Sequence, residues 1–138
     1  MSIAYFPSHE AVETLEVAFV KPAGDEVTLR LLVDSGFTGN SSFVLPMSAD
    51  ELSHAQAAAS RVMGALQGLQ NRIVVTCRVP TLSFRTMAIA ILADTSELEL
   101  PPTVDGMVGL QFLRRFRRWG AEQIDVGSWQ FFLQTDAT

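Results

Sequence analysis

Asp34 is the first residue in the chain whose type and position suggest chemistry. The run from Val27 to Val33 becomes increasingly apolar, and Asp34, Ser35 and Gly36 follow it directly. A carboxylate at the end of a buried strand is costly unless its surroundings are built for its charge. Such a carboxylate can act as a general acid or base. Asp, Ser and Gly are also ordinary turn residues, so the tripeptide alone is better interpreted as a plain turn.

The flanking residues favour the catalytic interpretation. The sequence LLVDSGFTG at residues 31–39 resembles the catalytic loop of aspartic peptidases, in which two hydrophobic residues precede Asp-[Ser/Thr]-Gly. With Leu45 and Pro46 it is similar to prokaryotic retropepsin-like proteins. A second signature of that family, an apolar pair and a glycine before a short helix, is resembled by MVGLQFL at residues 107–113. The resemblance covers residues 15 to 133 and implies a retropepsin-like closed β-barrel, the half-lobe of an acid protease.

The chemistry of this family explains why a dimer is expected. Peptide hydrolysis without a covalent intermediate needs a base to activate water and an acid to protonate the substrate. Two carboxylates held close together do both, because they share one proton. The chain has only one Asp-[Ser/Thr]-Gly, so a homodimer would supply the second carboxylate, with Asp34 from each subunit. The resemblance implies the same arrangement, with a peptide or protein substrate and no metal or organic cofactor.

The resemblance also assigns roles around Asp34. The Ser35 hydroxyl is expected to hydrogen-bond across the dimer, and Gly36 to let the substrate backbone approach the acids, as only a residue without Cβ can. Phe37 and Thr38 are expected to contact substrate. Val33, Phe37 and Val108 are expected to line apolar pockets.

Gly109 is expected to let its strand pack tightly against the Asp34 loop. By itself it is equally well interpreted as a helix-start glycine, and its pairing with the Asp34 motif decides the assignment. Residues 61–73 fall where the family has its flap, a hairpin that closes over substrate. Gly64 and Gly68 suit a mobile tip that contacts substrate, although the stretch does not match the glycine-rich flap of retroviral proteases well.

Two features depart from the family pattern. Retroviral members often carry an acid soon after the catalytic glycine, whereas Phe37, Thr38, Gly39 and Asn40 occupy these positions here. Elsewhere, the sequence DTS at residues 94–96 imitates the catalytic motif but has Ser96 in place of glycine. We interpret it as a structural echo of Asp34 and not as a second catalytic acid.

Periodicity predicts a mostly β single domain over residues 1–138 with internal pseudo-two-fold layout. Alternating or apolar runs predict strands at 15–19, 27–33, 42–45, 73–79, 87–93, 104–108, 123–126 and 129–133. Ser48 and Glu51 form a capping-box pattern that predicts a helix over 49–59, and a second short helix is predicted over 110–118. Hairpin, apolar strand, short strand and helix thus occur from residue 15 to 59 and again from 73 to 118.

Composition limits the other functions. The chain has 138 residues and a net charge of −5, which disfavours nucleic acid as a partner. The arginines at 114, 115, 117 and 118 are better interpreted as a solvated helix face. His9 and His54 lack metal-ligand spacing, so no zinc site is expected. The lone Cys77 is expected to be a buried strand thiol. No leader or membrane segment is apparent, and a cytoplasmic location is expected.

The leading hypothesis is therefore a homodimeric aspartic endopeptidase that uses two Asp34 carboxylates. The first alternative is a catalytically weak or inactive retropepsin-like dimer that binds peptides, which the missing acid after Gly36 and the ill-fitting flap favour. The second alternative is an unrelated small β-barrel binding protein, which requires both motifs to be accidental.

Overall fold

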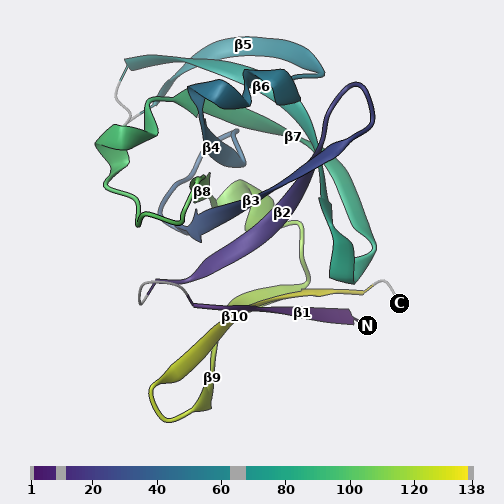
Figure 1. Cartoon of the computed structure of the whole chain (residues 1–138), viewed down its shortest axis with the longest axis vertical. Helices are drawn as coiled ribbons and strands as arrows, with labels where there is room; N and C mark the ends of the chain where they lie inside the picture. The colour runs from purple at the N-terminus through teal and green to yellow at the C-terminus, as the bar shows by residue number, and fades with distance from the viewer. Residues whose placement is uncertain (1, 9–11, 63–67, 137–138) are drawn as a thin grey trace.

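Six strands of the chain close into a barrel. The computed structural model describes residues 2–8, 12–62 and 68–136. The strands of its larger sheet are β2 Thr14–Val20, β3 Glu26–Val33, β4 Phe43–Pro46, β5 Ala55–Val62, β6 Gly68–Val79, β7 Phe84–Ala93 and β8 Gly106–Val108. They run in the order β2-β3-β8-β4-β7-β6-β5, and β2 also pairs with β6. That pairing closes the barrel, from which β5 extends as the outer strand of a hairpin with β6 (Figure 1).

The two halves of the barrel are related in register. Strand β3 pairs in parallel with β8, and β7 pairs in parallel with β4. If Asp34 is superposed on Asp94, the pair Leu32–Met107 falls on Leu92–Leu45, and the pairs beside it match in the same way. Each half thus supplies the long strand that pairs with the short strand of the other half. The predicted mostly β fold with pseudo-two-fold layout is confirmed.

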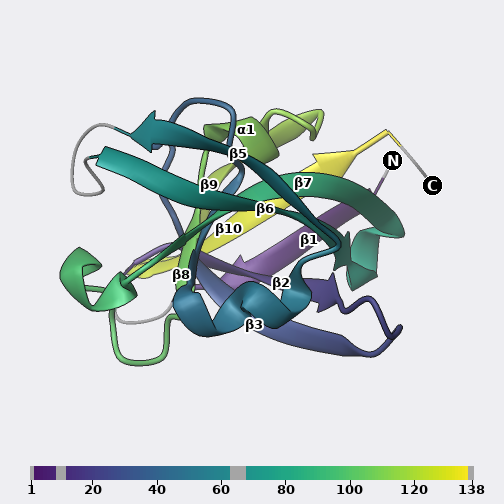
Figure 2. The same cartoon turned by 90° about the horizontal axis from the view of Figure 1, so that it is seen from above.

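A second, smaller sheet lies against the barrel. Its strands β1 Ser2–Pro7, β10 Ser128–Thr135 and β9 Arg118–Asp125 are antiparallel in the order β1-β10-β9. Figure 2 shows this sheet crossing beneath the barrel strands. Ala4, Phe131 and Leu133 point from its inner face into the main core. Sequence analysis assigned no element to residues 2–7, so β1 was missed.

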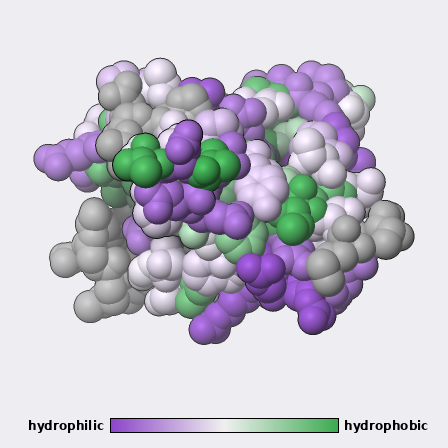
Figure 3. Space-filling model, turned by 90° about the horizontal axis from the view of Figure 1, so that it is seen from below, coloured by the Kyte–Doolittle hydropathy of each residue, from purple (hydrophilic) through white to green (hydrophobic). Residues whose placement is uncertain are grey.

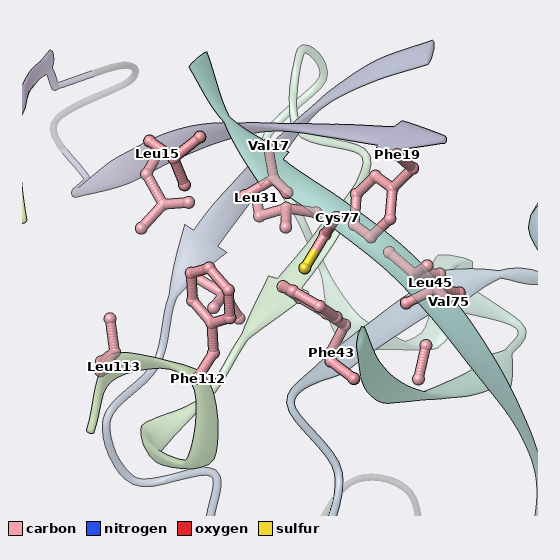
Figure 4. Packing of buried hydrophobic residues seen from close by; sticks show 14 of the residues in the cluster. Leu15, Val17, Phe19, Leu31, Phe43, Leu45, Val75, Cys77, Phe112 and Leu113 are labelled. Atoms are coloured by element: carbon pink, nitrogen blue, oxygen red, sulfur yellow. The ribbon is translucent and has the colours of Figure 1, made fainter. Parts of the chain in front are cut away.

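The core fills the barrel with side chains from both halves. Phe19, Phe43 and Phe112 are fully buried. The ring of Phe43 lies between the other two, with centroid distances of 5.1 Å to Phe19 and 5.0 Å to Phe112. Figure 4 shows these rings with Leu31 and Cys77 among the inward-pointing residues. Aromatic pairs at such distances contribute about 0.5–1.5 kcal/mol beyond the area they bury. Strands β2 and β4 supply Phe19 and Phe43, and the segment after β8 supplies Phe112.

The predicted helix over residues 49–59 is wrong. The chain forms the 3₁₀ helix η1 Met47–Leu52 and then strand β5. Pro46 precedes η1 without a side-chain cap, and Glu51 forms an ion pair with Lys21 at 3.4 Å. From His54, whose amide donates to Val74 O at 2.8 Å, the backbone pairs with β6. Helix propensity is a weak preference, and the tertiary pairing with β6 overrides it in this alanine-rich segment.

The second predicted helix, over 110–118, is also too long. The α-helix α1 spans Leu110–Leu113, and Arg118 already belongs to β9. Phe112 and Phe116 turn into the core and pack on Phe84. Two further 3₁₀ helices, η3 Pro80–Leu82 and η4 Thr95–Leu98, connect strands. The helices of this fold are therefore single turns that place one or two core residues each.

Candidate active site

Asp34 is half-buried at the end of β3, in a tight turn. Its amide donates to Val108 O at 2.9 Å, and its carbonyl accepts from the Phe37 amide at 3.1 Å. Its carboxylate oxygen Oδ1 accepts from the Gly36 amide at 3.0 Å. Among the residues that the structure describes, no other donor lies within hydrogen-bond distance of this carboxylate. The turn therefore fixes the direction of the acid and leaves Oδ2 open.

The second motif holds the turn in place. The Gly109 amide donates to Ser42 O at 2.9 Å, and the Leu110 amide donates to Phe37 O at 3.0 Å. A Cβ on Gly109 would come within 2.6 Å of Phe37 O and would also overlap its ring. Only glycine fits here without displacing the loop. The expected tight packing of the Gly109 strand against the Asp34 loop is confirmed.

A glycine that sequence analysis did not single out has a similar role. A Cβ on Gly106, at the start of β8, would collide with the carbonyl oxygen of Val44 on β4. Glycine in the middle of a sheet often marks such a close approach of two backbones. The sequence signal was its position in a short apolar strand, three residues before Gly109. Together the two glycines bring β8 against both β4 and the Asp34 turn.

An apolar cluster lies behind the Asp34 turn. Buried side chains from β4, β7 and β8 form its base, and half-buried ones lie on it. The latter are Leu32, Phe37, Leu98 and Leu100. Leu98 and Leu100 come from the segment between β7 and β8, for which the sequence predicted neither a strand nor a helix. The sequence signal was the spacing of Leu98 and Leu100, two apolar residues that are two positions apart in this segment and pack on the cluster.

The other predicted site residues differ in exposure. Ser35, Gly36 and Thr38 are exposed on the turn, so their side chains and backbone are accessible to a partner or ligand. A Cβ on Gly36 would lie 3.2 Å from Asp34 Oδ1, which is a tight approach. Val108 is fully buried in the main core cluster. Its contribution to a site within this one chain is therefore the carbonyl that accepts from the Asp34 amide.

The described residues of the segment expected to be the flap lie in two paired strands. Strands β5 and β6 pair in antiparallel fashion up to Val62 and Gly68, with a register shift between Ala57 and Ser60. Gly68 is the first residue of β6, whereas Gly64 lies outside the described residues. Figure 1 shows the hairpin along the top of the barrel, beyond β7. The strand prediction at 73–79 was correct in type but began five residues too late.

The DTS segment forms a turn with the same hydrogen bond as the Asp34 turn. Asp94 Oδ1 accepts from the Ser96 amide at 3.1 Å and from the Ser96 hydroxyl at 2.6 Å. These bonds hold the pKa of the exposed Asp94 carboxyl below its usual value, the hydroxyl contributing most. Strands β8 and β4 lie between the strands that end at Asp34 and Asp94. In the closed ring of six strands, β3 and β7 therefore lie on opposite sides of the barrel, too far apart for the two carboxylates to share a proton.

The other titratable groups of the described residues give no competing site. Burial raises the pKa of the Cys77 thiol to about 12, so it stays protonated and unreactive at neutral pH. This confirms the buried strand thiol predicted from sequence. Within residues 2–8, 12–62 and 68–136, no group of three or more His, Cys, Asp or Glu side chains could hold a metal ion. In the same part of the chain, no helix is long and apolar enough to cross a membrane.

Comparison with known proteins gives one likeness in structure. No family model matches the chain, and no curated protein matches it. Among solved structures, the chain is similar to the EIAV protease complexed with the inhibitor HBY-793. The TM-score is 0.44 and the sequence identity 16%, over 77% of this chain and 88% of that one. The closed barrel and its strand order rest on the strand pairings described above.

Proposed function

We propose that two copies of this chain form an aspartic endopeptidase, with one Asp34 carboxylate from each copy in a shared site. The observation that carries the proposal is the turn at the end of β3. It presents a half-buried carboxylate with one free oxygen, and the second motif of the sequence braces the turn through Gly109 and Leu110. Both motifs on which the sequence resemblance rests thus meet at one place.

The second carboxylate of the pair comes from another copy of the chain. Asp94 is the only other acid in a turn of this kind among the described residues, and two strands separate it from Asp34. A two-fold axis close to the exposed Ser35 and Gly36 brings the two Asp34 side chains together. One carboxylate then takes a proton from water while the protonated one donates to the carbonyl oxygen of the substrate.

Substrate binds as an extended peptide between the paired turns and the β5–β6 hairpin. Backbone hydrogen bonds of the strand type give affinity, and pockets give preference for side chains. The half-buried Phe37, Leu98 and Leu100 beside the turn favour hydrophobic residues next to the cleaved bond. Thr38 and Gly36 are exposed where the peptide backbone passes, and Gly68 belongs to the hairpin that covers it.

The deciding experiment is cleavage of an unfolded model protein by wild type and by Asp34→Asn, from acidic to neutral pH. Solution mass is recorded for both proteins. We expect a dimeric wild type that cleaves and an equally dimeric variant that does not. Cleavage that survives in Asp34→Asn would refute the catalytic role of this residue.

A peptide-binding dimer without turnover is the second candidate. The observation that favours it is the absence of an acid at residues 37–40, where retroviral enzymes bind the substrate backbone. If it is correct, wild type and Asp34→Asn bind a library of unfolded peptides equally and neither releases a product.

A further inference from the structure

Exposed apolar side chains gather on the small sheet. Seven large hydrophobic residues are exposed in the described part of the chain, and five belong to β1, β10, β9 or the β9–β10 turn. They are Ile3, Tyr5, Ile124, Val126 and Trp129. Figure 3, which views the molecule from the side of this sheet, shows apolar groups on that face. Exposed apolar side chains that gather on one part of a monomer mark an interaction site.

The densest part of this surface is the β9–β10 turn. Val126 is 96% exposed and Ile124 58%, and Trp129 follows two residues after the glycine of the turn. A turn is normally polar, so an isoleucine and a valine at a hairpin end have no explanation within the single chain. We call Ile124, Val126 and Trp129 the hairpin patch.

No strand of the described residues pairs with the outer edge of β9. In the order β1-β10-β9, β9 pairs with β10 on one side only, and six of its eight residues are exposed. The opposite edge strand, β1, lies against β2 and η3. An open edge strand of this length presents backbone donors and acceptors to another strand. The hairpin patch and the free edge adjoin each other, so one partner can cover both.

Hydrogen bonds connect the hairpin patch with the Asp34 turn. Ser8 Oγ lies 3.1 Å from Trp129 O and 2.9 Å from Glu13 Oε2. The carbonyl of Glu13 accepts from the amide of Val33 at 2.9 Å, one residue before Asp34. Figure 1 shows the β9–β10 turn and the end of β3 on the same side of the molecule.

We propose that a second copy of this chain docks on the hairpin patch and pairs with β9 about a two-fold axis near Ile124. The inference rests on the proposed function, since the shared site needs a second Asp34, and it names the surface that brings this residue in. An axis through the middle of β9, at Ala121, would lie about 10 Å further from the β9–β10 turn. Ile124 would then lie opposite Arg118, and the two hairpin patches would not meet.

The charges along β9 are compatible with the same register. In an antiparallel pair about an axis normal to the sheet, one residue must face its own copy, because paired residues point to the same face. Centring the pair on Glu122 or Asp125 would place two carboxylates opposite each other, which is destabilising. Centring it on Ile124 brings two apolar side chains together and sets Gln123 opposite Asp125. No like charges then face each other directly.

A cysteine at the axis tests this register. Residues that face each other across antiparallel strands are close enough for a disulfide, and the native Cys77 is buried and does not compete. Ile124→Cys is compared with Met87→Cys, because Met87 on β7 has the same exposed fraction of 58%. Under mild oxidation we expect a covalent dimer from Ile124→Cys alone. Equal cross-linking of both variants, or of neither, would overturn the register.

A charge at the same position tests the interface. We expect Ile124→Lys to be a folded monomer at concentrations at which wild type and Met87→Lys are dimers. Its melting temperature should lie within a few degrees of that of wild type diluted until it is monomeric. If Ile124→Lys stays dimeric and active, the interface lies elsewhere while the shared-aspartate function stands. If wild type itself is monomeric and inactive, the proposed function fails first.

Discussion

The molecule contains the same acidic turn twice, and the two copies have diverged in what surrounds them. Asp34 and Asp94 occupy equivalent places in the two halves of the barrel, and each accepts from the amide two residues later. At Asp94 a serine hydroxyl adds a second hydrogen bond to the same oxygen. At Asp34 the equivalent residue is glycine, and the carboxylate is left with a single donor among the described residues.

The residues that follow the short strands β8 and β4 also differ between the two halves. With Asp34 superposed on Asp94, Gly109 falls on Met47, which is exposed at the start of η1. Gly109 is buried and touches the backbone of Phe37 in the Asp34 turn. Thus, among the described residues, the Asp34 carboxylate has one hydrogen-bond donor and its turn is packed against Gly109, whereas the Asp94 carboxylate has two donors. A barrel with two similar halves needs only a few such differences to make its two acidic turns unlike.

The largest expected difference between the two turns is in catalysis. Asp34→Asn is expected to lower the rate of peptide cleavage by about 10²–10⁴-fold, the usual contribution of a general acid or base. Asp94→Asn, its matched control, is expected to leave the rate at the wild-type level. The assay is cleavage of an unfolded protein with both variants at equal dimer concentration.

The comparison becomes sharper if the second turn is given the catalytic sequence. Ser96→Gly changes it to Asp-Thr-Gly, and in the Asp34→Asn background we expect no recovery of cleavage. The motif is not sufficient, since Asp94 lacks a glycine at the position of Gly109 to brace its turn. Recovery of activity in the double variant would show that the two turns are interchangeable.

The next effect is on stability and concerns the brace. Gly109→Ala places a Cβ within 2.6 Å of Phe37 O, so the Asp34 turn must shift. We expect a loss of about 1–3 kcal/mol in the free energy of unfolding, as for other overpacked sites. Met47→Ala at the equivalent position should change it by less than about 0.5 kcal/mol, because the side chain is exposed. Urea unfolding of both variants measures the difference, and equal values would show that Gly109 does not brace the turn.

Sequence analysis predicted the strands better than the helices, for a physical reason. The core positions of β2, β3, β6 and β7 repeat along the chain with the period of a strand, which is a local property. Whether residues 49–59 form a helix depends on a distant strand, because β5 is held by β6. The pairing of β1 with β10 joins the two ends of the chain. Neither pairing leaves a signal in a short window.

The candidate site shows the same division. The position of Asp34 at a strand end and the packing role of Gly109 were predicted from motif and context. Leu98 and Leu100 were not, because their packing beside Phe37 follows from the way β7 and η4 lead back to β8. The hairpin patch at residues 124–129 was also missed, since only the folded sheet shows that these apolar residues are exposed.

The smallest effect concerns the hydroxyl that distinguishes the two turns. Ser96→Ala removes the donor that contributes most to lowering the pKa of Asp94, so this pKa should rise towards its usual value. A carboxyl with a lowered pKa in the folded state adds stability above its unfolded pKa, and this stability is lost as the pH falls through the folded pKa. The difference in unfolding free energy between wild type and Ser96→Ala should therefore be present at neutral pH and vanish in acid.

The control for this prediction is Ser53→Ala. The Ser53 hydroxyl donates to the carbonyl of Ala55 at 3.0 Å, a bond with no titratable partner, so its loss should change stability equally at every pH. NMR titration of the Asp94 carboxyl and urea unfolding at neutral and acidic pH measure the two quantities. A Ser96→Ala effect that is as independent of pH as that of Ser53→Ala would mean that the hydroxyl orders the turn without stabilising the charge. The second acid would then differ from Asp34 in geometry alone.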